Sequence, residues 1–275
     1  MTRLQGRFLA YGMCVALVAA LVATAGAGCA RGSESKVDFP RASDGKPDLS
    51  GIWQALSTAA WDLEDHTASD GVPAGQGVVD GGEIPYLPAA LEQRQRNAVA
   101  GRTPDPVTTV TGDPLSMCYL PGVPRAIYLP YPFQIAQSDT ALVMNFEFAR
   151  ASRVIPTGAP RDDEGVESWM GDPRGSWDGD TYVIDNINFN DRTWFDRAGN
   201  FHSDALHVVE RLTPMGRDHV RYQATIEDPK VFSKPWTISM PLYRRIEPNV
   251  QVLEYHCLEF LEPKIYGPLG KQAAK

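Results

Sequence analysis

The chain has 275 residues, 43% of them hydrophobic, and a formal net charge of −8 at pH 7. The apolar content includes six Trp, ten Tyr and ten Phe, which is enough for a packed core and excludes a globally disordered chain. An acidic chain without basic clusters argues against a nucleic-acid-binding protein and against electrostatic adsorption to anionic lipid.

The N-terminus carries the pattern of an export signal over residues 1–28. Arg3 and Arg7 form a basic head, a mostly apolar stretch follows at 8–23, and small residues precede Cys29. The apolar stretch is too short and wrongly flanked for a transmembrane helix. The signal predicts that the mature protein works outside the cytoplasm, in the periplasm.

The small residues 24–28 before Cys29 resemble a bacterial lipobox, in which the cysteine becomes the lipidated first residue of the mature protein. This resemblance implies a lipoprotein anchored to a membrane of the cell envelope. Simple cleavage after Ala25 or Ala27 is the alternative. Residues 29–46 are polar and lack periodicity, as expected of a tether between anchor and domain.

The rest of the chain is predicted to form a single β-rich domain over residues 47–266, followed by a C-terminal tail at 267–275. Gly and Pro number 24 and 22, a high share that predicts many turns between short strands. Residues 62–85 are acidic and glycine-rich. We expect them to form a long surface excursion rather than part of the core.

One helix is predicted at Pro88–Ala100. Pro88 suits the first helical turn, and Gly101 is expected to stop the helix. Leu91 and Val99 mark its apolar side, which we expect to face the domain.

From about residue 107 onward the chain is expected to be mainly β-structure. The pair Asp178-Gly179 between extended segments is the strongest local signal for a hairpin. The expected β segments are, in order, Phe133–Gln137, Ala141–Ala149, Ser176–Asp185, Leu206–Thr213, His219–Ile226, Trp236–Tyr243 and Gln251–Phe260. Short strands separated by turns predict an antiparallel meander, closed as a lipocalin-like barrel or stacked as a sandwich, with one or two short helices.

Residues 206–213 alternate in polarity, as on a strand with two different faces. One face carries His207, Val209 and Arg211, and the other carries Leu206, Val208, Glu210 and Leu212. Because its three aliphatic residues outweigh one valine, we expect the second face to fill the core and the first to face solvent. In the opposite orientation, the His–Arg row would line the barrel interior and could bind a carboxylate, phosphate or enolate.

Five segments resemble a widespread family of exported bacterial proteins that has no established activity. They are DPLSMCYLPGVPR (113–125), GDPRGSWDGDTYVID (171–185), HVVERLT (207–213), ATIEDPKVFSKPW (224–236) and LEYHCLEF (253–260). The resemblance covers most of the predicted domain and implies no particular reaction. Separately, Gly51-Ile52-Trp53 resembles the Gly-x-Trp element with which lipocalin-like barrels often open, and this modestly favours a barrel.

Two cysteines remain in the predicted domain, Cys118 and Cys257, because Cys14 leaves with the signal and Cys29 is the anchor. In an oxidising compartment, a disulfide between them is the simplest interpretation. A reactive or metal-binding thiol is the alternative, but neither residue belongs to a CxxC motif. No bound metal is expected, since the sequence contains no HExxH and no EF-hand pattern.

Acid–base catalysis has a small set of candidate residues. A neutral histidine beside a carboxylate can act as a general base near pH 7, and His202 or His207 with Asp204 could supply that pair. Arg125 or Arg211 would then stabilise a developing anion. The alternative is a solvated turn around Asp204, with His207 as an ordinary residue of the barrel wall.

Ligand binding has a second set of candidates. Trp53, Trp177, Trp194 and Trp236 could line an apolar pocket, although isolated tryptophans more often anchor a core. Glu147 lies between two phenylalanines. Facing inward, it would have a raised pKa, as an acid catalyst needs; facing outward, it would leave the phenylalanines to the core.

Two arginines are expected to serve the structure rather than the chemistry. Arg125 follows a PGVP segment and Arg153 follows a strand-like apolar run. We expect each to form an ion pair, with Glu147, Glu210 or Asp185 as the available partners.

Two functions fit these residues best. The first is a protein that binds a small apolar or aromatic ligand in a barrel cavity. The second is an isomerase, lyase or hydrolase that uses His/Asp acid–base chemistry in the same cavity. No organic cofactor is expected, because no P-loop, dinucleotide fingerprint or nucleophile elbow occurs. A purely structural envelope protein is a third interpretation.

Overall fold

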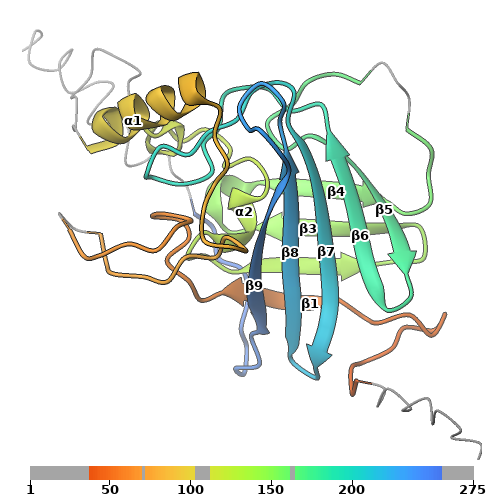
Figure 1. The fold of residues 1–275 in the computed structure, drawn as a ribbon. Helices are drawn as coiled ribbons and strands as arrows, with labels where there is room; N and C mark the ends of the chain where they lie inside the picture. Colours follow the sequence, from red (N-terminus) through yellow and green to blue (C-terminus); the bar gives the residue numbers. More distant parts are fainter. Residues whose placement is uncertain (1–36, 70–71, 103–111, 162–164, 256–275) are drawn as a thin grey trace, which may run out of the picture. The chain divides into compact units, whose positions relative to one another are not determined.

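Nine strands form one antiparallel sheet that curls into a nearly closed barrel (Figure 1). The computed structural model describes residues 37–69, 72–102, 112–161 and 165–255. The chain divides into residues 1–36 and residues 37–275, and all described residues belong to the second part. The prediction of a mainly β, antiparallel domain is therefore confirmed, and the barrel is the form that it takes.

The elements of this domain follow one another in a simple order. The strands are β1 (Gly51–Ala55), β2 (Phe133–Gln137), β3 (Ala141–Phe146), β4 (Ser152–Pro156), β5 (Asp172–Asp178), β6 (Thr181–Ile187), β7 (His207–Gly216), β8 (His219–Glu227) and β9 (Trp236–Arg244). The helices are α1 (Pro88–Arg102) and α2 (Arg125–Tyr128), with short 3-10 turns η1 (Pro114–Met117) and η2 (Phe148–Arg150). Across the sheet the strand order is β4-β3-β2-β1-β9-β8-β7-β6-β5.

The inner faces of the two halves of the sheet meet to form the core. Figure 1 shows β1–β4 running across the direction of β6–β9, so that the curled sheet closes on itself. Inward side chains come from nearly every strand, and those that are fully buried include Trp53, Phe133, Leu142, Ile155, Ile184, Val208, Leu212, Tyr222, Ile226 and Ile238. All four residues of α2 are buried as well, because the helix packs against β1 at one end of the barrel.

The predicted alternation of β7 and β8 is confirmed. Val208, Glu210 and Leu212 face inward, whereas His207 and Arg211 lie on the outer face. The Asp-Gly hairpin is also confirmed, since β5 and β6 pair antiparallel across a turn at Gly179. Gly179 has φ of +58°, a conformation that residues with a Cβ rarely adopt.

The prediction of a helix starting at Pro88 is confirmed, but Gly101 does not stop it, because α1 continues to Arg102. Its buried face also differs from the expected one. Leu91 and Val99 are 44% and 68% exposed, and the buried residues of the helix are Ala90 and Asn97. The reason is a close approach of the helix to Gly199, where a Cβ atom would lie within 3 Å of the helix backbone. Small and polar residues fit this contact better than leucine does. No helix within the described ranges is long and apolar enough to cross a membrane.

The packed region begins earlier than the predicted start at Pro47. Phe39 is buried and its ring stacks on Trp53 with a centroid separation of 6.4 Å. Arg41 forms a bidentate ion pair with Asp180 in the β5–β6 turn. The last part of the predicted tether therefore lies against the barrel.

The segment at 62–85 was predicted to be a surface excursion outside the core, and this is wrong for part of it. Leu63, Val79 and Ile84 from this segment are buried in the core. Its backbone also bonds to β9, since the Asp80 N–H donates to the Thr237 carbonyl. This burial was not predicted, because the apolar residues of the segment are separated by acidic and glycine-rich stretches and follow no helix or strand period.

Three strand predictions need correction. β1 and β4 were not predicted as strands, because their polarity does not alternate. In β1 two apolar residues, Ile52 and Trp53, are adjacent, and in β4 an inward Arg153 precedes an outward Val154. The expected strand at Gln251–Phe260 is not a strand in its described part, 251–255. There Tyr255 packs against Tyr131 and Phe148 instead.

Candidate functional site

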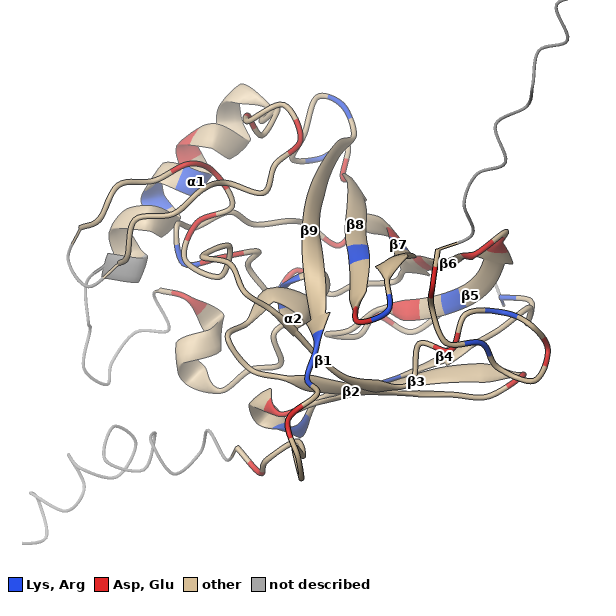
Figure 2. Cartoon of the chain, turned by 90° about the horizontal axis from the view of Figure 1, so that it is seen from below, with Lys and Arg blue, Asp and Glu red and all other residues tan. Residues whose placement is uncertain are grey.

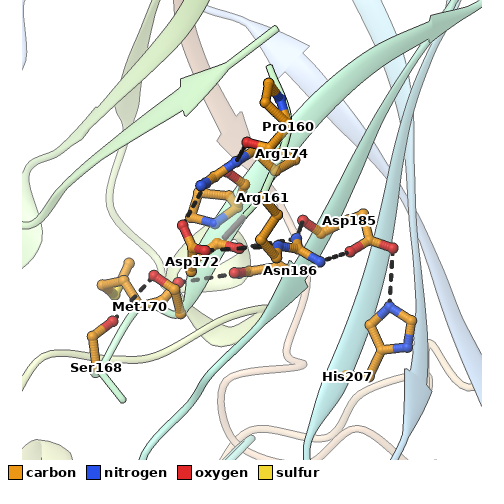
Figure 3. Close-up of polar contacts among 11 residues, drawn as sticks. Pro160, Arg161, Ser168, Met170, Asp172, Arg174, Asp185, Asn186 and His207 are labelled. Atoms are coloured by element: carbon orange, nitrogen blue, oxygen red, sulfur yellow. Dashed lines mark hydrogen bonds and ion pairs between the residues drawn. The ribbon is translucent and has the colours of Figure 1, made fainter. Parts of the chain in front are cut away.

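A polar group on the outer face of the barrel, shown in Figure 3, consists of Asp185 on β6, His207 on β7 and Arg161 from the segment after β4. We call it the outer cluster. His207 Nε2 lies 3.1 Å from Asp185 Oδ2, and His207 Nδ1 lies 3.8 Å from Glu227 Oε2. Arg161 donates to Asp185 Oδ1 and to the Asp185 carbonyl, both at 2.6 Å, and to the Asp172 carbonyl at 3.0 Å. His207 thus meets a carboxylate, but it is Asp185 rather than the predicted Asp204.

Asp185 remains ionised in this cluster. Burial alone would raise the pKa of the Asp185 carboxyl, but hydrogen bonds from Arg161 and His207 outweigh it and lower the pKa below its ordinary value. The cluster joins the loop after β4 to strands β5–β7 (Figure 3). Both imidazole nitrogens of His207 lie near a carboxylate, and these contacts explain the position of the ring as part of a structural cluster.

Asp185→Asn should destabilise the protein slightly at pH 7, by less than about 1 kcal/mol, because the carboxylate is 45% exposed and solvent screens it. The folded-state pKa is lowered, so the stabilisation is present above pH 3.8 and is lost as pH falls through the folded pKa. Urea denaturation at pH 7 and pH 3 checks this. A difference between variant and wild type that persists undiminished at pH 3 would contradict it.

Arg211 and Asp204, two other predicted catalytic residues, have exposed partners of their own. Arg211 donates to Asp178 at 2.7 Å on the outer face. Asp204 accepts from Lys230 at 2.5 Å and does not contact His202. The expected His202–Asp204 pair fails because the chain turns there rather than continuing as a strand.

The turn is held by Asp228. Its carboxylate accepts from the Ser203 N–H at 2.6 Å and from the Ser203 hydroxyl at 2.9 Å. These bonds divert the chain between His202 and Asp204. Residues two apart therefore do not share a face, as they would on a regular strand.

His202 is a buried core histidine. Its Nδ1 lies 2.9 Å from the Ser203 carbonyl, and its Nε2 lies 2.6 Å from the Thr193 hydroxyl. Since a carbonyl only accepts, the network assigns the proton to Nδ1 and makes Nε2 the acceptor. Burial lowers the pKa of His202, and the ring packs on Phe195 in the neutral form.

Several predicted residues nevertheless lie at the loop from Thr193 to His202. We call this loop, together with Arg125 and Trp236 that contact it, the loop cluster. Arg125 approaches the Trp194 carbonyl at 3.4 Å, and Phe195 packs between His202 and Trp236. The Arg125 guanidinium is occupied, however, by a bidentate ion pair with Asp113 at 2.6 and 2.7 Å. Arg125 therefore forms a structural ion pair, as expected, but its partner is Asp113 and not one of the three predicted acids.

Asp196 is the ionisable centre of the loop cluster, and no motif in the sequence marks it. Its fully buried carboxylate accepts from the Leu63 N–H at 2.9 Å and from the Asn200 N–H at 3.1 Å. Burial, followed by repulsion from Asp62, raises the pKa of Asp196 to about 7. A carboxyl with this pKa can exchange a proton near neutral pH.

Helix α1 contacts the same group through Arg94. Its Nε donates to Asn200 Oδ1 at 3.3 Å, and Tyr86 donates to the same oxygen at 2.9 Å. Arg94 Nη2 lies 3.7 Å from both Asp62 and Glu64. Burial also raises the pKa of Glu64.

The barrel interior holds a third polar group, the interior triad: Arg153 on β4, Glu210 on β7 and Tyr222 on β8. Arg153 pairs with Glu210 through two contacts of 2.5 and 3.2 Å, and Tyr222 donates to Glu210 at 2.8 Å. The paired side chains are 1% and 0% exposed. Burial, with the charge of Glu210, raises the pKa of Tyr222 well above its ordinary value and keeps the hydroxyl protonated.

The four predicted tryptophans do not surround one pocket. Trp53 is buried, donates to the Leu49 carbonyl and carries Arg244 over its ring at 4.3 Å. Trp177 lies on β5 with its ring edge against Tyr182. Trp194 and Trp236 both adjoin the loop cluster, as described above. Trp53 and Trp236 are buried in the core, and Trp177 is partly buried and packs against it.

Glu147 faces away from the core. Its carboxylate accepts from the Leu253 N–H at 2.9 Å, while Phe146 and Phe148 are buried. Of the two orientations considered for Glu147, the outward one is therefore observed. Its contact ties the described C-terminal residues to the start of η2.

Two of the three cysteines with predicted roles, Cys29 and Cys257, lie outside the described residues. Cys118 is described and follows η1. The predicted disulfide and the lipid anchor therefore stay predictions. Among the residues that the structure describes, no group of three or more His, Cys, Asp or Glu side chains could hold a metal ion.

The fold and these groups define an antiparallel β-barrel domain with an ion pair in its interior and a buried carboxyl of raised pKa in the loop cluster. No protein-family model, curated protein or solved structure matches the chain. The resemblance to a family of exported bacterial proteins therefore stays an expectation.

A sequence signal existed for part of the interior triad. Glu210 alternates with Val208 and Leu212, which places an acid on the inward face, and such an acid requires a buried partner. Arg153 was one of the two arginines for which an ion pair with Glu210 was considered. Asp196 carried no comparable signal, because its pKa depends on which loops cover it.

Proposed function

We propose that this chain is an exported, lipid-anchored envelope protein whose barrel binds a small, uncharged ligand with an apolar or aromatic body. The export signal and Cys29 support the location. The nearly closed barrel supports binding, since barrels of about eight strands either fill with side chains or enclose one small ligand.

The observation that carries the proposal is the interior triad. A buried ion pair adds little stability compared with apolar residues of the same volume, so its presence in an apolar interior favours a functional use. Arg153 Nε is buried and has no hydrogen-bond partner among the described residues. That N–H is the donor that a ligand carbonyl or hydroxyl would engage.

The charge of the triad indicates the ligand class. One guanidinium faces one carboxylate, and Tyr222 is uncharged. An anionic ligand would leave an excess negative charge in a desolvated interior, which is costly. A neutral ligand with one polar group and an apolar remainder satisfies the triad and the aliphatic wall together.

Native mass spectrometry of the mature protein, purified under mild conditions from the cell envelope, should reveal a retained neutral small molecule. The paired replacement Arg153→Met with Glu210→Leu preserves the fold while removing the polar group, so it should reduce ligand occupancy at least about tenfold, the loss of one charged hydrogen bond.

The matched control is Arg245→Met with Glu247→Leu, because this pair has the same chemistry in a surface position. It should retain the ligand at the wild-type level. An empty wild-type protein, or equal occupancy in the interior double variant, would contradict the proposal.

An enzyme in the same domain is the second candidate, and one observation favours it. Asp196 supplies a carboxyl with a pKa of about 7, as general acid–base chemistry needs. An isomerase, lyase or hydrolase would then depend on Asp196 rather than on the predicted histidines. Conversion of the retained ligand by wild type but not by Asp196→Asn would favour this alternative over binding alone.

A further inference from the structure

The two edge strands of the sheet, β4 and β5, face each other along what we call the seam. Both figures of the whole chain place these strands at the same side of the barrel, as Figure 2 shows from below. Every neighbouring pair in the sheet is antiparallel, so with nine strands the two edges must run parallel. Parallel pairing is also what the single bridge between Thr157 and Gly175 shows.

The sequence at the seam does not favour a continuous backbone ladder. The bond described there runs from the Gly158 N–H to the Gly175 carbonyl at 2.8 Å, beyond the end of β4. Pro156 in β4 and Pro173 in β5 have no N–H to donate. The edges therefore approach each other without the regular ladder that joins the other strands.

Side chains from β4 and from the loop after it reach β5 and the strands beyond it instead. Thr157 Oγ1 lies 2.7 Å from the Tyr182 hydroxyl on β6, and Arg153 pairs with Glu210 on β7. On the outside, Arg161 donates to the Asp172 carbonyl on β5 and to Asp185 on β6. Such contacts can break one by one, whereas a ladder must open cooperatively.

Both ends of the barrel are covered by other segments. At one end α2 is buried, with Ile127 and Tyr128 no more than 1% exposed. At the other end, Arg41 binds Asp180 in the β5–β6 turn, and Lys46 donates to the Gly179 carbonyl in the same turn. Opening either end requires displacement of a packed segment.

We infer that the seam is the lateral entrance through which the ligand reaches the interior triad. This inference rests on the proposed function. Transient separation of β4 from β5 would expose Arg153, which lies on the edge strand itself, without unfolding the rest of the sheet. The ligand would therefore meet its polar partner directly on entry.

Cysteine accessibility tests the opening without any ligand. Ile155→Cys places a thiol on the inward face of β4, and Ile238→Cys places one on the inward face of β9; both isoleucines are fully buried. In the full mature protein, N-ethylmaleimide should label position 155 at least about tenfold faster than position 238. Equal labelling rates would overturn the inference.

A loosened seam provides the second measurement. Arg161→Ala removes the outer contact and should accelerate labelling at position 155 by about 5- to 10-fold, the effect of losing a charged hydrogen bond. It should accelerate association of the neutral dye N-phenyl-1-naphthylamine by a similar factor. Arg245→Ala, remote from the seam, is the control and should change neither rate.

The outcomes separate the two proposals. Dye binding with an association rate unaffected by Arg161→Ala would overturn the entrance while leaving ligand binding intact. Rapid labelling at position 155 with no dye binding in wild type would overturn the proposed function, and the entrance with it.

Discussion

Arg153→Ala is expected to lower the free energy of unfolding by about 3–5 kcal/mol, because it leaves Glu210 buried and charged without its counter-ion. Glu210→Ala should lower it by a similar amount, because Arg153 is then left buried and charged without its counter-ion. Tyr222→Phe should cost only about 1–2 kcal/mol, since the ion pair survives and one hydrogen bond is lost. Urea denaturation at pH 7 measures all three.

The informative control is the double replacement Arg153→Met with Glu210→Leu. Both charges are then absent and the apolar volume is kept, so the double variant should be within about 2 kcal/mol of wild type. A loss in the double variant equal to the sum of the two single losses would contradict the description of the pair as mutually compensating.

Raising the pH should destabilise the protein through Asp196. Its pKa rises from 3.8 to about 7 on folding, so its contribution to stability is complete below pH 3.8 and is lost as pH rises toward 7. In Asp196→Asn this titration is absent. The free-energy difference between variant and wild type should therefore shift by about 2–3 kcal/mol in favour of the variant between pH 5 and pH 8.5.

Other titrating groups appear in both proteins and largely cancel in this difference. They include His202, whose buried neutral form opposes the trend at low pH, and Glu64, whose pKa is raised by burial. Asp204→Asn is the control. Its pKa is lowered by Lys230, so it stays ionised across this range and its variant should run parallel to wild type. A flat difference for Asp196→Asn would show that Asp196 is ionised throughout.

Local patterns predicted the strands well where burial alternates with exposure. On β7 and β8 every second residue contacts the core, so polarity alone reveals which side faces inward. The short strands β1 and β4 escaped prediction because their sequence polarity does not follow their burial; in β4 the arginine at 153 is buried and the valine at 154 is exposed. The face of α1 was mistaken because its packing depends on the close approach to Gly199, which no helical periodicity encodes.

The candidate site could be predicted only in part, for a related reason. Alternation placed Glu210 inward, and an inward acid called for an arginine, but the choice of Arg153 required knowing that β4 lies across the barrel from β7. The expected His202–Asp204 pair failed because Asp228, 24 residues beyond Asp204, bends the chain between them.

The sequence by itself determined the antiparallel strands and their inward faces, because each depends on residues close together in the chain. For the same reason it predicts an export signal. Only the tertiary structure decided the partners of the charged residues, the neutral-range pKa of Asp196 and the unladdered seam. Burial and Coulomb interactions depend on distances in space, and segments far apart in the sequence set those distances.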